Sequence, residues 1–115
     1  MSAATIDPAT FAELQSAAGA DFVKELIDTF LEEAPPMLEE LRETLAAGNA
    51  EAFRRAAHTL KSNGNTFGAL TLGGLARELE LGGLEAARHA DPDALEALAR
   101  EYARVAEALT ELRNA

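Results

Sequence analysis

The sequence predicts an all-α protein, an antiparallel four-helix bundle with a short N-terminal helix that caps it. Ala, Leu, Glu and Arg dominate the composition and β-branched residues are few, which favours helix along almost the whole chain. Four long stretches repeat apolar residues every three or four positions, and short turns separate them. A length of 115 residues suits one compact domain, so we expect residues 1–115 to form a single domain.

The first helix is bounded by turn residues. Asp7-Pro8 has the form of an N-cap followed by Pro at the first helical position, and Gly19 ends this short helix.

A second helical stretch begins near Asp21, and its first apolar residues cover nearly half of the circumference, more than one helix contact needs. Pro35-Pro36 then interrupts it. Either a new helix begins with these prolines in its first turn, or one long helix bends there. Gly48 is a candidate for the left-handed residue that ends the stretch, and Asn49 for the next N-cap. The apolar residues are Phe22, Val23, Leu26, Ile27, Phe30 and Leu31, then Met37, Leu38, Leu41 and Leu45.

The third helix, from about 50 to 67, separates an apolar stripe from a polar face. At 100° per residue His58 lies about 140° from Phe53, so the histidine points away from the stripe. Arg54, Ser62 and Asn65 share the face of His58, and Lys61 follows one turn on, on the exposed side. The stripe consists of Phe53, Ala56, Ala57, Leu60, Gly64 and Phe67.

Gly68 separates the third helix from a fourth, and Gly82-Gly83 are candidates to fray or end the fourth. Glu80 and Gly73 lie on the flank of its apolar stripe, where Gly73 permits close approach of another helix. Asp91-Pro92 predicts the start of the last helix. The two stripes are Leu72, Leu75, Ala76 and Leu79, then Leu95, Leu98, Tyr102, Val105, Leu109 and Leu112.

Composition and charge exclude several classes of function. The formal net charge is -10, whereas binding a phosphate backbone needs many Lys and Arg contacts, so we expect neither nucleic acid nor an anionic membrane as a partner. The chain has no Cys, which excludes disulfides and thiolate metal sites. The first ten residues lack the regions of a signal peptide, and no apolar run approaches the roughly 18 residues of a membrane span. We therefore expect a monomeric, cytoplasmic protein.

The surroundings of His58 are unusual for an acidic chain. Residues 52–77 contain no Asp or Glu but carry Arg54, Arg55, Lys61 and Arg77. A catalytic triad or a metal site would need a positioned acid or several inward-facing ligands, and the inward stripes are apolar. An exposed imidazole beside cations can instead act as a nucleophile that carries a phosphoryl group, because its neutral form has a free lone pair. The alternative is an ordinary surface histidine.

These residues resemble a known family. The string His58-Thr59-Leu60-Lys61, followed by Gly64, Phe67, Gly68 and Ala69, resembles the histidine-containing phosphotransfer (HPt) domain, and the likeness covers nearly the whole chain. Two positions depart from the family pattern: Ser62 replaces the usual glycine, and Asn63 replaces the next small residue and faces inward on the helical wheel.

The resemblance implies roles for three residues. His58 would accept a phosphoryl group on Nε2, Lys61 would steady the phosphate, and Glu80 would hold Nδ1–H from the neighbouring helix. The resemblance also implies a phosphorelay in which receiver domains of response regulators and hybrid sensor histidine kinases are the partners. The receiver would supply the bound Mg²⁺, and the chain would have no cofactor and no autokinase activity of its own.

Two other features complete the predictions. His89 lies near a helix C-terminus, where an imidazolium suits the helix dipole, and we interpret it as structural or incidental. The alternative function is a non-catalytic interaction module that binds a partner through the wide apolar arc from Phe22 to Leu31. Receiver docking would use the same arc, so the arc does not separate the two hypotheses.

Overall fold

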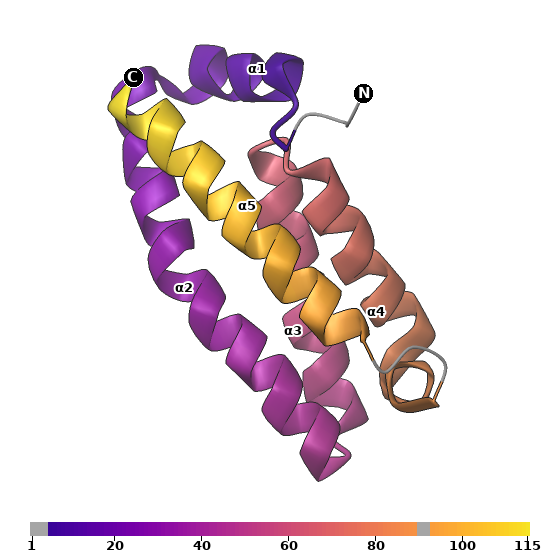
Figure 1. Cartoon of the computed structure of the whole chain (residues 1–115). Coiled ribbons are helices and arrows are strands. Elements are labelled where there is room, and N and C mark those ends of the chain that lie inside the picture. Colours follow the sequence, from indigo (N-terminus) through magenta and orange to yellow (C-terminus); the bar gives the residue numbers. More distant parts are fainter. Residues whose placement is uncertain (1–4, 90–92) are drawn as a thin grey trace.

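Five helices form almost all of the computed structural model, which describes residues 5–89 and 93–115 (Figure 1). They are α1 (Pro8–Ala18), α2 (Ala20–Ala47), α3 (Ala50–Thr66), α4 (Leu70–His89) and α5 (Ala94–Asn114). Within the described residues there is no strand, so the all-α prediction is confirmed. Helix α2 packs on α3, α3 on α4, α4 on α5, and α5 back on α2. Helix α1 lies across the end of this helical bundle where α5 ends and α3 meets α4 (Figure 1).

The predicted cap of α1 also ties this helix to the bundle. The Asp7 carboxylate accepts a hydrogen bond from the Thr10 N–H at 3.0 Å, as the N-cap prediction requires. The Asp7 N–H donates to the Gly68 carbonyl in the turn between α3 and α4, at 2.8 Å. Gly68 has φ +86, and a Cβ there would lie 3.0 Å from the Asp7 carbonyl oxygen. Glycine is therefore needed at this turn, both for its backbone conformation and for the close contact with α1.

Helix α2 is continuous through Pro35-Pro36, which settles the alternative left open by the sequence. Pro35 has no N–H to donate to the carbonyl of Leu31 four residues earlier. The hydroxyl of Tyr102, on α5, donates a long hydrogen bond of 3.5 Å to that carbonyl. Burial raises the pKa of the Tyr102 hydroxyl, so the phenol remains a donor. Both proline rings are exposed, and they do not obstruct the packing of α2.

The apolar stripe of α3 lies in the core as predicted. Every residue of the stripe is buried, and Phe53 and Leu60 are fully buried. The core covers only part of the wide apolar arc on α2: Val23, Ile27 and Phe30 are buried, whereas Phe22 is 51% exposed.

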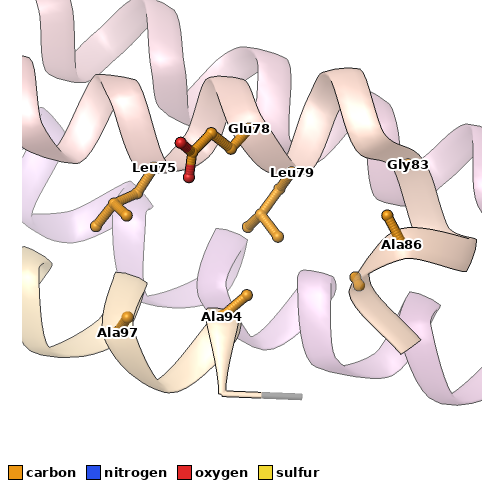
Figure 2. Close-up of a pocket in the computed structure, with 8 residues that line it drawn as sticks. Leu75, Glu78, Leu79, Gly83, Ala86, Ala94 and Ala97 are labelled. Carbon is orange, nitrogen blue, oxygen red and sulfur yellow. The ribbon is translucent and has the colours of Figure 1, made fainter. Parts of the chain in front are cut away.

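A sharp bend at Gly83 divides α4. Gly83 has φ 73 and ψ -174, and the chain then resumes a helix to His89. The non-helical backbone at Gly83 agrees with the prediction that Gly82-Gly83 fray or end the helix, although a further helical segment follows directly within α4. A small apolar pocket lies between the bend and the start of α5, where Leu75 and Leu79 face Ala94 and Ala97 (Figure 2). The predicted start at Asp91-Pro92 lies outside the described residues, and α5 is assigned from Ala94.

Gly73 allows the close approach of α3 and α4 that the sequence predicted. A Cβ at Gly73 would lie 1.9 Å from Oδ1 of Asn65, so the amide occupies the space of the missing side chain. This contact lies between α3 and α4, two turns along α3 from His58.

A Leu60→Ala variant should lose about 2–5 kcal/mol of unfolding free energy, because it leaves a cavity in the core. Urea unfolding measures the loss. Ser62→Ala, two residues away on the exposed face, should change the free energy by no more than about 0.5 kcal/mol. Equal effects of the two substitutions would mean that the buried face of α3 is wrongly assigned.

The ion pair between Asp28 of α2 and Arg113 of α5 should make stability depend on acid pH. The Arg113 guanidinium donates to both Asp28 oxygens, at 2.9 Å for Nη2–Oδ2. This hydrogen bonding lowers the pKa of the Asp28 carboxyl below the ordinary 3.8, with desolvation opposing. A carboxyl with a lowered folded pKa contributes stability above its unfolded pKa and loses it as the pH falls through the folded pKa.

The melting temperature of Asp28→Asn should therefore lie below that of the unmodified protein at pH 6, and the two should converge toward pH 2. Thermal unfolding followed by circular dichroism measures both. Glu25→Gln removes a carboxylate of the same helix that has no ion-pair partner among the described residues, and it serves as the control. A difference in melting temperature between Asp28→Asn and the unmodified protein that stays constant with pH would contradict the proposed ion-pair contribution.

Candidate functional site

His58 lies on the outer face of α3, with 57% of its side chain exposed. The turn that carries it is held by the buried Ala57 and Leu60 on the opposite face of the helix. Ser62, one turn further, is also exposed and small, so access to the ring from solvent is open. The predicted orientation of the histidine is therefore what the packing of α3 produces.

Glu80 of α4 reaches His58 across the contact between the two helices. Its Oε2 lies 2.8 Å from Nδ1 of the imidazole. A carboxylate can only accept, so Nδ1 carries the hydrogen and Nε2 keeps its lone pair when the ring is neutral. The sequence placed Glu80 only on the flank of its helix, and tertiary packing brings it to the ring.

The second oxygen of Glu80 binds Lys61. Lys61 Nζ lies 2.9 Å from Oε1, and the lysine side chain is only 23% exposed. Oε1 is itself buried and has no hydrogen bond of regular geometry among the described residues, so the contact is an ion pair. The prediction that Lys61 lies on the exposed side is corrected: its side chain is largely shielded, and its ammonium is held against α4.

These two contacts determine the charge of Glu80. The Lys61 ammonium lowers the pKa of the Glu80 carboxyl most strongly, and the His58 imidazole lowers it further, while partial desolvation opposes both. The carboxyl is therefore ionised at neutral pH and remains an acceptor for Nδ1–H.

A shallow depression surrounds the imidazole. It is lined by Glu51, Arg54, Arg55, His58 and Glu80. Although residues 52–77 contain no acid, the fold therefore places Glu51 and Glu80 around His58. Sequence reasoning missed Glu51 because the stretch was counted from the next residue. A helical wheel would have found it, since it lies about 20° from His58, two turns earlier.

The other residues singled out in the sequence lie away from the ring. Asn63 is half-buried and lines an open groove between α2 and α3, together with Thr29 and Glu33. His89 is exposed beyond the bend of α4 and pairs at 3.4 Å with Glu85, a surface contact between residues four apart. This placement agrees with the incidental role predicted for His89.

The assembled group is chemically simple. A half-exposed imidazole has one nitrogen held by a carboxylate and the other free, with guanidinium groups lining the same depression. Such a ring can attack an electrophilic phosphorus, and the cations can stabilise the anionic product.

Comparison with known proteins agrees with this chemistry. The sequence matches the family model described as the Hpt domain over residues 25–115. The crystal structure of histidine-containing phosphotransfer protein B (HptB) from Pseudomonas aeruginosa PAO1 is similar, with 32% sequence identity and a TM-score of 0.88. The similarity covers 98% of this chain and 97% of that chain. No protein with a curated function matches the sequence.

The chain therefore belongs to the Hpt domain family. It is a phosphotransfer intermediate of phosphorelay signalling, a phosphoryl carrier rather than a classical enzyme, whose partners are receiver domains and kinases. This finding favours the phosphorelay hypothesis over the non-catalytic interaction module. In residues 5–89 and 93–115, none of the helices combines the length and apolar character of a bilayer span.

Removing Glu80 should change the tautomer of His58. In the unmodified protein the neutral ring should carry its hydrogen on Nδ1, and in Glu80→Ala it should move largely to Nε2, because the acceptor for Nδ1–H is lost. Nitrogen-15 NMR of the imidazole distinguishes the two forms. Phosphoryl acceptance should fall about 10- to 100-fold, as for other residues that orient a reactive imidazole.

Glu85→Ala provides the matched control, because it removes the carboxylate beside the other histidine. It should alter neither the spectrum of His58 nor the rate. An Nδ1–H tautomer that persists in Glu80→Ala would contradict the orienting role of Glu80.

Proposed function

We propose that His58 is the phosphoryl acceptor and that its Nε2 is the attacking atom. The observation that carries this assignment is the 2.8 Å contact of Nδ1 with Glu80 on a ring that is 57% exposed. It supports a free lone pair on Nε2 at the surface, where a partner can reach it.

The transfer would proceed by in-line attack. The Nε2 lone pair forms the P–N bond while the P–O bond to the receiver's aspartate breaks, and the aspartate leaves as a carboxylate. The ring keeps its Nδ1 hydrogen, so positive charge develops on the imidazole. The Glu80 carboxylate beside Nδ1 would stabilise that charge without any rearrangement. The reverse steps would pass the group to the aspartate of another receiver.

Lys61 would contribute positive charge close to the phosphoryl group. In the resting protein its ammonium lies 2.9 Å from Glu80 Oε1, so it also offsets the charge of that carboxylate. We propose that this combination limits the repulsion that a bare carboxylate would exert on an incoming phosphoryl dianion.

The partners proposed are receiver domains of response regulators and hybrid sensor histidine kinases. The receiver would supply Mg²⁺ and most of the electrostatic stabilisation, and this chain the nucleophile, with no cofactor and no autokinase activity. We also propose that the chain is one domain and a cytoplasmic monomer. Its four long helices would form an antiparallel four-helix bundle capped by α1, which the packing order and the short connections support.

A His58→Gln variant should accept no phosphoryl group from a phosphorylated receiver, because the amide lacks a nucleophilic lone pair of comparable strength. His89→Gln should accept at the normal rate. The measurement is transfer of labelled phosphate, scored as acid-labile and base-stable. Both variants should keep the helical circular dichroism spectrum, since both side chains are largely exposed. Label that persists in His58→Gln, or is lost in His89→Gln, would refute the assignment.

A further inference from the structure

The structure raises the question of which cation meets the phosphoryl group on Nε2. Lys61 is already paired with Glu80 at 2.9 Å and is mostly shielded from solvent. The depression around the ring is lined by Arg54 and Arg55 but not by Lys61. The cations that share the open surface with His58 are therefore these arginines.

The orientation of the ring also favours the arginines over Lys61. Nδ1 faces Glu80 on α4, and Nε2 lies on the other side of the imidazole, away from α4. Lys61 and Asn65 contact α4, through Glu80 and at Gly73, and so mark the α4 side of α3. On a helical wheel Arg55 lies about 60° from His58 on the side away from α4, whereas Arg54 lies about 40° toward α4.

The helix also brings these side chains within reach of the ring. Side chains of an α-helix lean toward its N-terminus, so the imidazole of His58 extends over the preceding turn. Arg54 and Arg55 start from that turn, and both are exposed. Neither has an ion-pair partner among residues 5–89 and 93–115, so both guanidinium groups can bind an anion.

The local charge balance depends on this arginine pair. The charge of Glu80 is offset by Lys61, and Glu51 offsets one arginine, which leaves one net positive charge around the depression. Loss of one arginine would make the surroundings of the ring neutral, and loss of both would make them negative. A phosphoryl dianion would then be repelled at short range.

We propose that Arg55, supported by Arg54, binds the oxygens of the phosphoryl group carried by Nε2. This inference rests on the proposed role of His58 as the acceptor. A guanidinium offers a planar fork of donors that matches two phosphoryl oxygens, and it remains charged at any physiological pH. The phosphohistidine is then stabilised by this chain alone, with no receiver bound.

The test uses a donor that needs no docking surface. Phosphoramidate transfers its phosphoryl group to the imidazole nitrogen as the P–N bond to ammonia breaks and ammonia leaves. The labelling rate of the full chain, and the half-life of the isolated phosphoprotein, are measured by phosphorus-31 NMR. We expect Arg55→Gln to slow labelling and shorten the half-life, each about tenfold, with a smaller effect of Arg54→Gln and a larger one of the double variant. Arg55→Lys should recover part of the loss, since it restores the charge without the fork.

Arg100→Gln is the matched control for loss of one positive charge. Arg100 is exposed on α5, which does not pack directly beside α3 in the described part of the chain, so its substitution should leave both quantities unchanged. Circular dichroism establishes that each variant is folded. Normal labelling and half-life in folded Arg55→Gln, with both reduced in Lys61→Ala, would overturn the inference and leave the proposed function standing. Failure of the unmodified protein to take label on His58 would overturn both.

Discussion

The site depends on one carboxylate that contacts two side chains of the neighbouring helix. Glu80 of α4 holds Nδ1 of His58 with one oxygen and the ammonium of Lys61 with the other, at 2.8 and 2.9 Å. The first contact directs the lone pair to Nε2, and the second keeps the carboxylate ionised, as its lowered pKa shows. A Gln at this position could accept from Nδ1–H, but it would carry no charge to pair with Lys61. Orientation of the proposed nucleophile and charge compensation thus come from the same side chain.

The packing of α3 against α4 keeps the Glu80 carboxylate within reach of His58 and Lys61. Asn65 fills the space left by the missing side chain of Gly73, which allows α3 to lie close to α4 two turns from the ring. The same two helices are joined at Gly68, where α1 is hydrogen-bonded through Asp7. A hydrogen bond of 2.8 Å tolerates little change in the distance between the two helices. The contacts at Gly73 and Gly68 therefore help to keep Glu80 at this distance from His58, although neither glycine touches the ring.

Charge is distributed unevenly on a chain whose formal net charge is -10. Cations gather on the face that carries His58, and the acids of that face are either paired, as Glu80 is, or accompanied by arginine, as Glu51 is. An acidic surface elsewhere disfavours association with polyanions, while a local positive face favours a phosphoryl group. In the proposed function, the nucleophile and its cations belong to this chain and the receiver would supply the metal.

The sequence by itself determined the helices, the buried face of α3 and the outward position of His58, because helical periodicity and capping are local properties of consecutive residues. It did not determine whether α2 would continue through Pro35-Pro36, since the Leu31 carbonyl finds a partner in Tyr102, 71 residues away in the chain. Nor could it place Glu80 of α4 against His58 and Lys61 of α3. Those contacts depend on the spacing and rotation of α3 relative to α4, and only tertiary packing fixes these. The pattern predicted which residues face outward, and the fold decided which of them meet.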